Sequence, residues 1–208
     1  MPTVYSHVAT CIDGYSPCVI NGLLSNATCT RRLRTKAKQG DMVLIYAGKK
    51  LNNERQLLCM YIVTASVPVL QYNNTLFHGQ LFRRPDQLYN RHGDRQFESP
   101  LRHNCPPNRS HDLFATNRSE QIDQKVLLST YFHFYVNADQ YPRHSRRVNG
   151  VPLTILDGID TRVKLPSHQN RQYKKTHLTQ HEFNTLVLQL ETTTRPYERL
   201  FNRSVVIT

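Results

Sequence analysis

Long apolar runs and a secretory leader are both missing from this chain of 208 residues. No stretch approaches the roughly 20 apolar residues that a membrane-spanning helix needs, so we expect no membrane partner. Residues 1–7 lack a basic segment followed by an apolar core, which argues against a signal peptide. We therefore expect an intracellular, cytoplasmic location, or a nuclear one if the source or host is eukaryotic.

Paired cysteines are lacking too. The chain has five cysteines at irregular spacing and no CxxC pair: Cys11, Cys18, Cys29, Cys59 and Cys105. Metal sites usually need two such pairs of Cys or His, each within a few residues. His177 and His181 have the i, i+4 spacing of ligands on a helix, but no Glu lies between them. We predict thiols kept reduced in a reducing compartment, and no metal site.

The signature motifs of common enzyme families are also absent. The sequence contains no GxSxG, Walker loop, GxGxxG or HExxH, and we expect no cofactor. Asp13, Asp41 and Ser129 could serve acid–base or nucleophilic chemistry. Each also has an ordinary structural use, Asp13 in a turn, Asp41 after a helix end and Ser129 within a strand. An enzyme is therefore an alternative and not the favoured class.

Acidic residues are scarce relative to basic ones. The chain has 15 Asp and Glu against 27 Lys and Arg, for a formal net charge of +12, and 19 of the basic residues are arginine. The planar guanidinium matches phosphate and stacks on flat rings. A basic, Arg-rich surface is typical of proteins that bind polyanions. The alternative is a generally basic surface without such a partner.

Hydrophobic patterning predicts several elements. Residues 4–9 form a strand, and a helix over residues 28–38 is capped by Asn26 or Thr28 and ends at Gly40. Residues 41–65 form two antiparallel apolar strands joined by a polar turn. Residues 126–136 are one strand, or a strand with a bend. A helix over residues 178–190 is capped by Thr179 and has one apolar face.

Two segments lack such patterns. Residues 83–124 are rich in Pro, Asn, Arg and His, and this length is typical of a functional loop or an insertion. Residues 192–208 form a C-terminal tail. The length of the chain favours a single domain over residues 1–208. We predict an α+β fold in which a small curled antiparallel sheet or barrel carries a few flanking helices and long basic loops.

Aromatic residues alternate with Arg and His in several places, for example around Arg84, Tyr89 and Tyr131. Nucleic-acid sites combine cations for phosphates with flat groups for bases. They also need a few donors and acceptors for base edges, which Asn, Asp and Ser supply. The favoured partner is therefore a nucleic acid or a nucleotide.

Three sequence blocks carry a family resemblance. Residues 13–17 read DGYSP, residues 24–41 follow LxNAxCxxxLRxxAxxGD, and residues 123–134 follow DxxVLLSxxFxF. With Tyr89 and a Gly-Asp pair at 93–94, these blocks resemble the second of the nucleotide modification-associated domain families. Members are known mainly from phage and bacterial sequences and are thought to act beside DNA-modification systems. The order of helix, Gly-Asp, apolar strand and polar hairpin also resembles the PUA-like superfold, including its EVE and YTH branches.

These resemblances imply a protein that reads a modified base of DNA in a pocket, because PUA-like domains are small barrels that hold a flipped base. The pocket would lie between the Asp13 turn, the helix over residues 28–38 and the strand over residues 126–136. The expected base- or nucleotide-binding residues are Asp13, Ser16, Asn26, Tyr89, Ser129 and Tyr131. The expected phosphate-binding residues are Arg31, Arg32, Arg34 and Arg84.

Two other functions remain open at the sequence level. One is an enzyme that modifies a nucleotide or base, with Asp13, Asp41 or Ser129 in its chemistry. The other is a phage accessory protein that sequesters a nucleotide or a host protein. Turnover of a nucleotide would favour the first, and tight binding of a small nucleotide without DNA affinity would favour the second.

Overall fold

The structure is a computed structural model, and it describes residues 1–9, 17–20, 22–26, 31–49, 51–68, 90–92, 96–98, 125–135, 150–155, 158–167 and 173–193. Its strands are β1 (Thr3–Ala9), β2 (Cys18–Ile20), β3 (Leu23–Asn26), β4 (Met42–Ala47), β5 (Gln56–Ile62), β6 (Ala65–Pro68), β7 (Asn90–His92), β8 (Gln96–Glu98), β9 (Lys125–Ser129), β10 (Tyr131–Phe134), β11 (Val151–Pro152) and β12 (Tyr173–His177). Its helices are α1 (Arg31–Lys36), the 3₁₀ turn η2 (Leu153–Ile155), α3 (Ile159–Arg162) and α4 (Gln180–Thr192).

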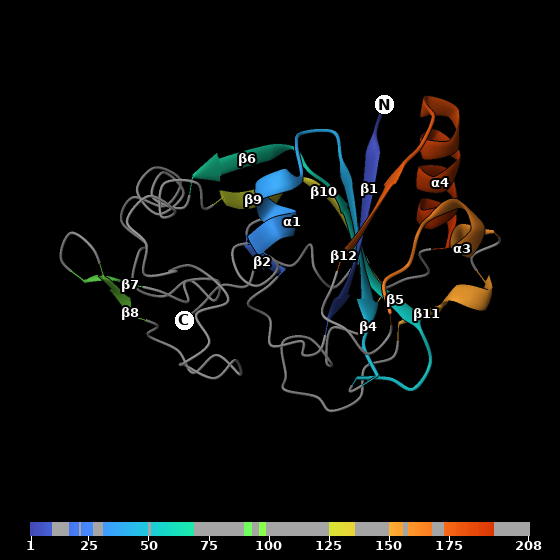
Figure 1. The fold of residues 1–208 in the computed structure, drawn as a ribbon, viewed down its shortest axis with the longest axis horizontal. Coiled ribbons are helices and arrows are strands. Elements are labelled where there is room, and N and C mark those ends of the chain that lie inside the picture. Colours follow the sequence, from blue (N-terminus) through green and yellow to red (C-terminus); the bar gives the residue numbers. More distant parts are fainter. Residues whose placement is uncertain are drawn as a thin grey trace.

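A six-stranded sheet forms the centre of the molecule (Figure 1). Its strands lie in the order β10-β5-β4-β1-β12, and β11 also pairs with β5. The sheet is mixed, because β1 and β4 run parallel while the other pairs are antiparallel. The prediction of a purely antiparallel sheet was therefore wrong. A parallel pair needs a crossover connection, and the chain between β1 and β4 includes β2, β3 and α1.

A second sheet has the order β2-β3-β9-β6. Two stretches of chain pass from one sheet into the other: β5 continues as β6 after residues 63–64, and β9 continues as β10 after Thr130. This arrangement curls the strands around a shared core. Over the described residues the sheets are not closed into a barrel, so of the two predicted alternatives, a curled sheet or a barrel, the barrel was wrong. What holds is mixed α and β structure in which sheets dominate over a few short helices.

Strands β4, β5, β9 and β10 coincide with the strongest apolar patterns in the sequence. Each residue of β4 is buried, as expected for a central strand covered on both faces. The antiparallel pairing of β4 with β5 confirms the predicted hairpin, and β9 with β10 confirms a strand with a bend. Gly40 ends the connection before β4 with a φ of 87°, which favours glycine, and its N–H donates to the Val63 carbonyl at 2.8 Å.

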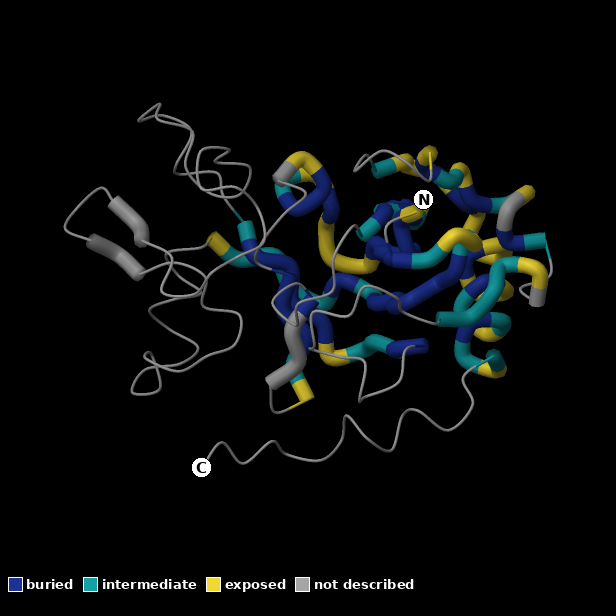
Figure 2. Tube along the Cα trace, turned by 90° about the horizontal axis from the view of Figure 1, so that it is seen from below, coloured by how far each residue is buried: buried dark blue, intermediate teal, exposed yellow. Residues whose placement is uncertain are grey.

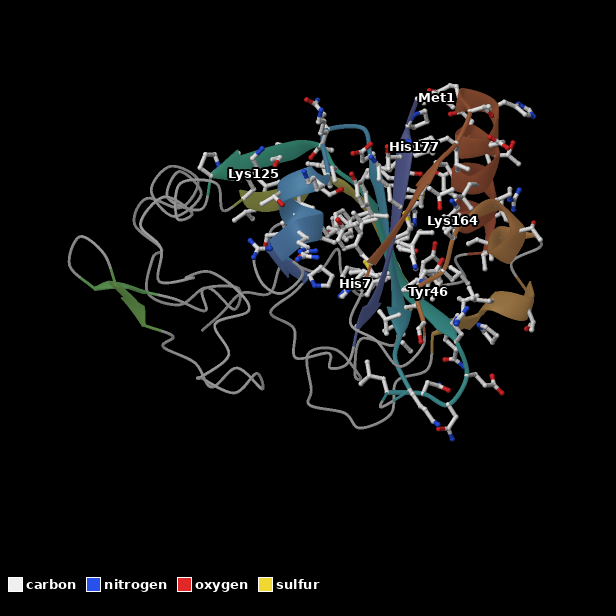
Figure 3. The ribbon with its side chains drawn as sticks, viewed as in Figure 1. Met1, His7, Tyr46, Lys125, Lys164 and His177 are labelled. Carbon is white, nitrogen blue, oxygen red and sulfur yellow. The ribbon has the colours of Figure 1, made fainter. Side chains whose placement is uncertain are left out.

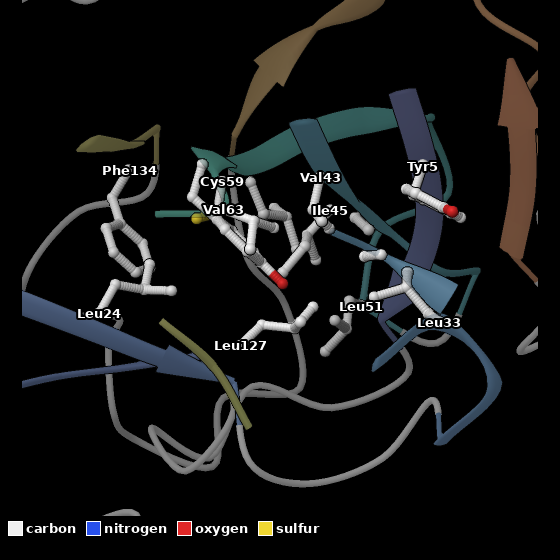
Figure 4. Packing of buried hydrophobic residues seen from close by; sticks show 14 residues of the cluster. Tyr5, Leu24, Leu33, Val43, Ile45, Leu51, Cys59, Val63, Leu127 and Phe134 are labelled. Carbon is white, nitrogen blue, oxygen red and sulfur yellow. The ribbon is translucent and has the colours of Figure 1, made fainter. Parts of the chain in front are cut away.

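Two apolar layers lie on opposite faces of the central sheet. Figure 2 colours the chain by burial and shows buried stretches in the interior of the described part, with exposed residues around them. We call one the α1 face, because α1 and the second sheet pack over it. Figure 4 shows this layer, with Tyr5, Val43 and Cys59 from the central sheet against Leu33 of α1 and Leu127 of β9. We call the other the α4 face, where α3 and α4 cover the opposite side of the same strands.

Helix α4 has the predicted cap. The Thr179 hydroxyl accepts from the Glu182 N–H at 3.2 Å, and the Glu182 carboxylate accepts from the Thr179 N–H at 2.7 Å. This reciprocal pair is a capping box. The apolar side of the helix buries Phe183, Leu186 and Leu190 on the α4 face, as its periodicity indicated.

Helix α1 is described over Arg31–Lys36, so it ends before the predicted Lys38, while residues 28–30 lie outside the described residues. Asn26 ends β3 and does not cap the helix, while Thr28 lies outside the described residues. Two short paired strands, β7 and β8, lie within the predicted loop over residues 83–124. The rest of that segment, and residues 194–208 of the predicted tail, lie outside the described residues.

Candidate nucleic-acid interface

Helix α1 separates its cations from its apolar side chains. Leu33 and Ala37 are buried in the core over the α1 face, four residues apart, as two neighbours on one side of a helix are. Arg32 and Lys36 have the same spacing on the other side, and both are exposed. Lys38 follows the helix and is also exposed. Since α1 itself contains no acidic residue, its described surface is a basic stripe.

Arg34 differs from Arg32, the other predicted phosphate ligand whose side chain is described. Its side chain is fully buried, with 0% of its surface exposed. The Arg34 NH1 donates to the Lys125 carbonyl at 2.6 Å, which joins α1 to the first residue of β9. A phosphate ligand has to meet its partner at the surface, so this position supports a structural role. The sequence grouped Arg34 with Arg31, Arg32 and Arg84 because all four are arginines.

Asn26 is also interior, with 2% of its surface exposed. Its Nδ2 donates to the Tyr61 hydroxyl at 2.7 Å, which links β3 of the second sheet to β5 of the central sheet. Burial raises the pKa of the Tyr61 phenol, so this hydroxyl stays protonated at ordinary pH. The amide of Asn26 therefore connects the two sheets, and its place in the fold does not suit a direct base contact.

Ser129 lies at the bend between β9 and β10. Its Oγ lies 2.6 Å from the carbonyls of both Ile62 and Tyr131, and it accepts from the Tyr131 N–H at 3.0 Å. The side chain is fully buried. These contacts satisfy the hydroxyl where the strand leaves one sheet for the other. They fit a structural hydroxyl better than a nucleophile or a base-contacting group.

Tyr131 lies on the side of the sheet away from α1. It packs against the apolar layer of the α4 face, and its hydroxyl donates to the Glu191 carboxylate of α4. Its ring meets that of His133 edge-on, at a centroid distance of 5.3 Å. A base bound beside α1 could not stack on this ring, because the sheet separates the two sites.

The Asp41 carboxylate accepts hydrogen bonds from two parts of the chain. Its Oδ1 accepts from the Thr3 N–H at 3.2 Å and its Oδ2 accepts from the Lys38 N–H at 2.8 Å. The side chain is 9% exposed. The carboxylate thus ties the start of β1 to the turn that precedes β4, which explains the Gly-Asp pair in structural terms. The enzyme alternative thereby loses Asp41 as a free acid–base group.

The remaining predicted residues lie outside the described part of the chain: Asp13, Ser16, Tyr89 and Arg84. For Arg31, only the backbone in α1 is described. The segment with Asp13 and Ser16 follows β1, whose last residue, Ala9, contacts Gly48. The Gly48 N–H donates to the Ala9 carbonyl at 2.7 Å, and a Cβ at Gly48 would lie 2.7 Å from that oxygen.

Strand β12 was missed in the sequence, and it brings a new aromatic group to the α1 face. Tyr173 is half-buried against the core there, with its ring 5.9 Å from that of buried Tyr5. His7 lies opposite Tyr173 in the β1–β12 register and is also half-buried. Figure 3 labels the His7 side chain. Burial, with the nearby charge of Asp41, raises the pKa of Tyr5 to about 12.

Exposed cations continue along β12, where Lys174 and Lys175 follow Tyr173. The carboxylates whose side chains are described and not buried lie elsewhere: Glu54 in the β4–β5 turn and Glu182 and Glu191 on α4. Among described side chains, α1 and β12 therefore carry cations without acidic residues, whereas α4 carries the acidic ones.

Metal and membrane features are absent from the part of the chain that the structure describes. No group of three or more His, Cys, Asp or Glu there could hold a metal ion, and His177 instead pairs with the Thr3 hydroxyl at 3.3 Å. Cys59 is a buried free cysteine, and burial raises the pKa of its thiol. None of the described helices is long and apolar enough to cross a membrane.

Comparison with known proteins adds no relative. No model of a protein family matches the chain, and no curated protein or solved structure matches it either. Function is therefore argued from the residues and their geometry.

Proposed function

We propose that this protein binds nucleic acid or a nucleotide and reads a modified base in a pocket beside α1. In finer terms, its curled sheets would be an open variant of the PUA-like arrangement, within the second nucleotide modification-associated family that the sequence resembles. The observation that carries the proposal is that the exposed cations described on α1 and β12 have no acidic residue in either element, which suits a polyanion.

The phosphate contacts would come from exposed cations. Arg32 and Lys36 lie one turn apart and can meet neighbouring phosphates of one strand. Arg31 and Arg84 remain proposed ligands of the same kind. Arg34 is assigned to the scaffold, because its guanidinium is buried and bonded to the Lys125 carbonyl.

The base contacts would come from the segment after β1. Asp13 and Ser16 supply an acceptor and a hydroxyl for the polar edge of a base. Asn26 and Ser129 would hold the wall of the pocket, because both are buried where the two sheets meet. Taking a base out of its stack costs a few kcal/mol, which stacking and edge hydrogen bonds must offset. Tyr89 stays a candidate for stacking.

The test is binding to matched oligonucleotides, single- and double-stranded, with and without modified cytosine or adenine, at two salt concentrations. Arg32→Gln with Lys36→Gln should weaken binding to all of them and lower the salt slope by about one per lost contact. The matched control is Lys49→Gln with Lys164→Gln, which removes two exposed lysines outside α1 and β12.

Three results would contradict the proposal. The first is the absence of binding to any oligonucleotide, and the second is an equal loss of affinity in the control pair. The third concerns the pocket alone. If Asp13→Ala and Ser16→Ala leave the preference among bases intact, the segment after β1 does not recognise the base.

A further inference from the structure

We propose that Tyr173 and His7 form a stacking platform for one unpaired base of a single-stranded nucleic acid. This inference rests on the proposed function, since it supplies the flat surface that a base-binding site needs. Neither residue belongs to the pocket described above, and Tyr131, which the sequence favoured for stacking, lies on the other face of the sheet.

The geometry of the two strands forms the platform. Tyr173 of β12 and His7 of β1 are partners in the register of an antiparallel pair, so their side chains lie on the same face of the sheet. Tyr5, on the same face, is 2% exposed and its ring lies 5.9 Å from that of Tyr173, at 50°. The Tyr5 ring therefore supports Tyr173, which keeps part of its own surface accessible.

Charge complementarity identifies the occupant. Lys174 and Lys175 follow Tyr173 along β12 and are exposed, and no carboxylate lies in this strand. Lys175 also lies on the α1 face, where it is opposite Tyr5 in the register. Lys174 lies on the opposite face, because side chains alternate along a strand. A flat ring with a lysine on the same face matches a base and a phosphate attached to it. A base in a duplex has its faces covered by neighbouring pairs, so the occupant is an unpaired base.

The test compares two ligands of equal length: oligo(dT) and an abasic oligomer that has the same sugar–phosphate backbone without bases. Tyr173→Leu should weaken oligo(dT) binding by about 5- to 100-fold, in the range known for base stacking, and leave the abasic oligomer unaffected. Tyr173→Phe keeps the ring and should bind like the unchanged protein. Lys175→Gln should weaken both ligands by a similar factor. Tyr131→Leu removes a tyrosine from the α4 face and should not change the ratio of the two affinities.

Circular dichroism and the thermal midpoint establish that each variant is folded. If Tyr173→Leu does not fold, His7→Leu tests the platform from the neighbouring strand. The platform is overturned if both leucine variants keep full affinity for oligo(dT), or if the protein binds both ligands equally well. It is also overturned if an acidic peptide competes as strongly as oligo(dT). In these cases the proposed function can still stand. If the unchanged protein binds neither ligand, the platform is overturned as well, and the proposed function fails only if the modified and double-stranded oligonucleotides are not bound either.

Discussion

Arg34 lies in the protein interior, although a guanidinium keeps its charge at all ordinary pH values. Burying a charge is costly unless hydrogen bonds satisfy it, and the Lys125 carbonyl supplies one of them at 2.6 Å. Arg32, two positions earlier, is exposed. Two arginines of one short helix thus have different uses, one in the scaffold and one at the surface.

Replacing Arg34 should therefore affect stability, and replacing Arg32 should not. We expect Arg34→Met to lower the free energy of unfolding by about 1.5–3 kcal/mol, because a buried carbonyl loses a charged donor. Arg32→Met should stay within about 0.5 kcal/mol of the unchanged protein. Urea denaturation measures both values. Equal stability of the two variants would show that the guanidinium of Arg34 contributes nothing to the scaffold.

The Asn26–Tyr61 hydrogen bond should behave as a coupled pair. Asn26→Ala and Tyr61→Phe each remove one partner of a buried hydrogen bond. Each should lower the free energy of unfolding by about 1–3 kcal/mol. The double variant should cost less than the sum, with a coupling of about 1 kcal/mol, because the second change removes a group that is already unpaired. A double-mutant cycle from urea melts gives this value. Simple additivity would mean that the two groups stabilise the fold independently.

At the scale of elements, the sequence predicted a strand or helix correctly where an apolar pattern is followed or preceded by a residue that marks its end. The hairpin of β4 and β5 and helix α4 have both, and the structure confirmed them. Strand β12 has neither, because it is an edge strand of the described sheet in which two adjacent lysines separate Tyr173 from Thr176. Edge strands often carry lysine, which discourages pairing with other chains, and this hides the apolar alternation that predicts a strand.

The candidate site was harder to predict for a related reason. Residue type alone grouped Arg34 with Arg32, but position relative to Leu33 and Ala37 decides which one is buried. Helical spacing could have separated them, since Arg34 lies three residues before Ala37 on the core side. Tyr173 and His7 lie 166 positions apart in the sequence, and only the pairing of β1 with β12 brings them together. No local pattern encodes such a contact.

The capping box of α4 gives this element a pH dependence. Hydrogen bonds from the Thr179 backbone and side chain lower the pKa of Glu182 below its ordinary value of 4.5. A lowered folded-state pKa contributes stability above 4.5, and this contribution is lost as the pH falls through the folded-state value. We expect Glu182→Gln to be less stable than the unchanged protein at pH 6 and equally stable once the pH is well below 4. Thermal melts across this range measure the difference, and a constant difference would exclude linkage through Glu182.

At the scale of the whole molecule, two stretches of chain run through both sheets. The stretch over β5 and β6 and the stretch over β9 and β10 each contribute a strand to both. The Thr64 N–H donates to the Leu128 carbonyl at 2.8 Å at one bend, and Ser129 lies at the other. The α1 face is enclosed between the sheets, so its core is shared and cannot be divided between them.

This continuity predicts that the two sheets unfold together. Native-state hydrogen exchange should give the amides of Leu44 in β4 and Leu127 in β9 the same opening free energy, because separating the sheets would expose their shared core. Ser129→Ala should lower both values equally, by about 1–2 kcal/mol, since it leaves backbone groups at the bend without their hydroxyl partner. Lys49→Gln, in an exposed position, should change neither. If Leu127 opened at a much lower free energy than Leu44, the second sheet would be an independent unit. A base held beside α1 would then bind to a wall that moves separately from the central sheet, and ligand affinity would depend on that motion.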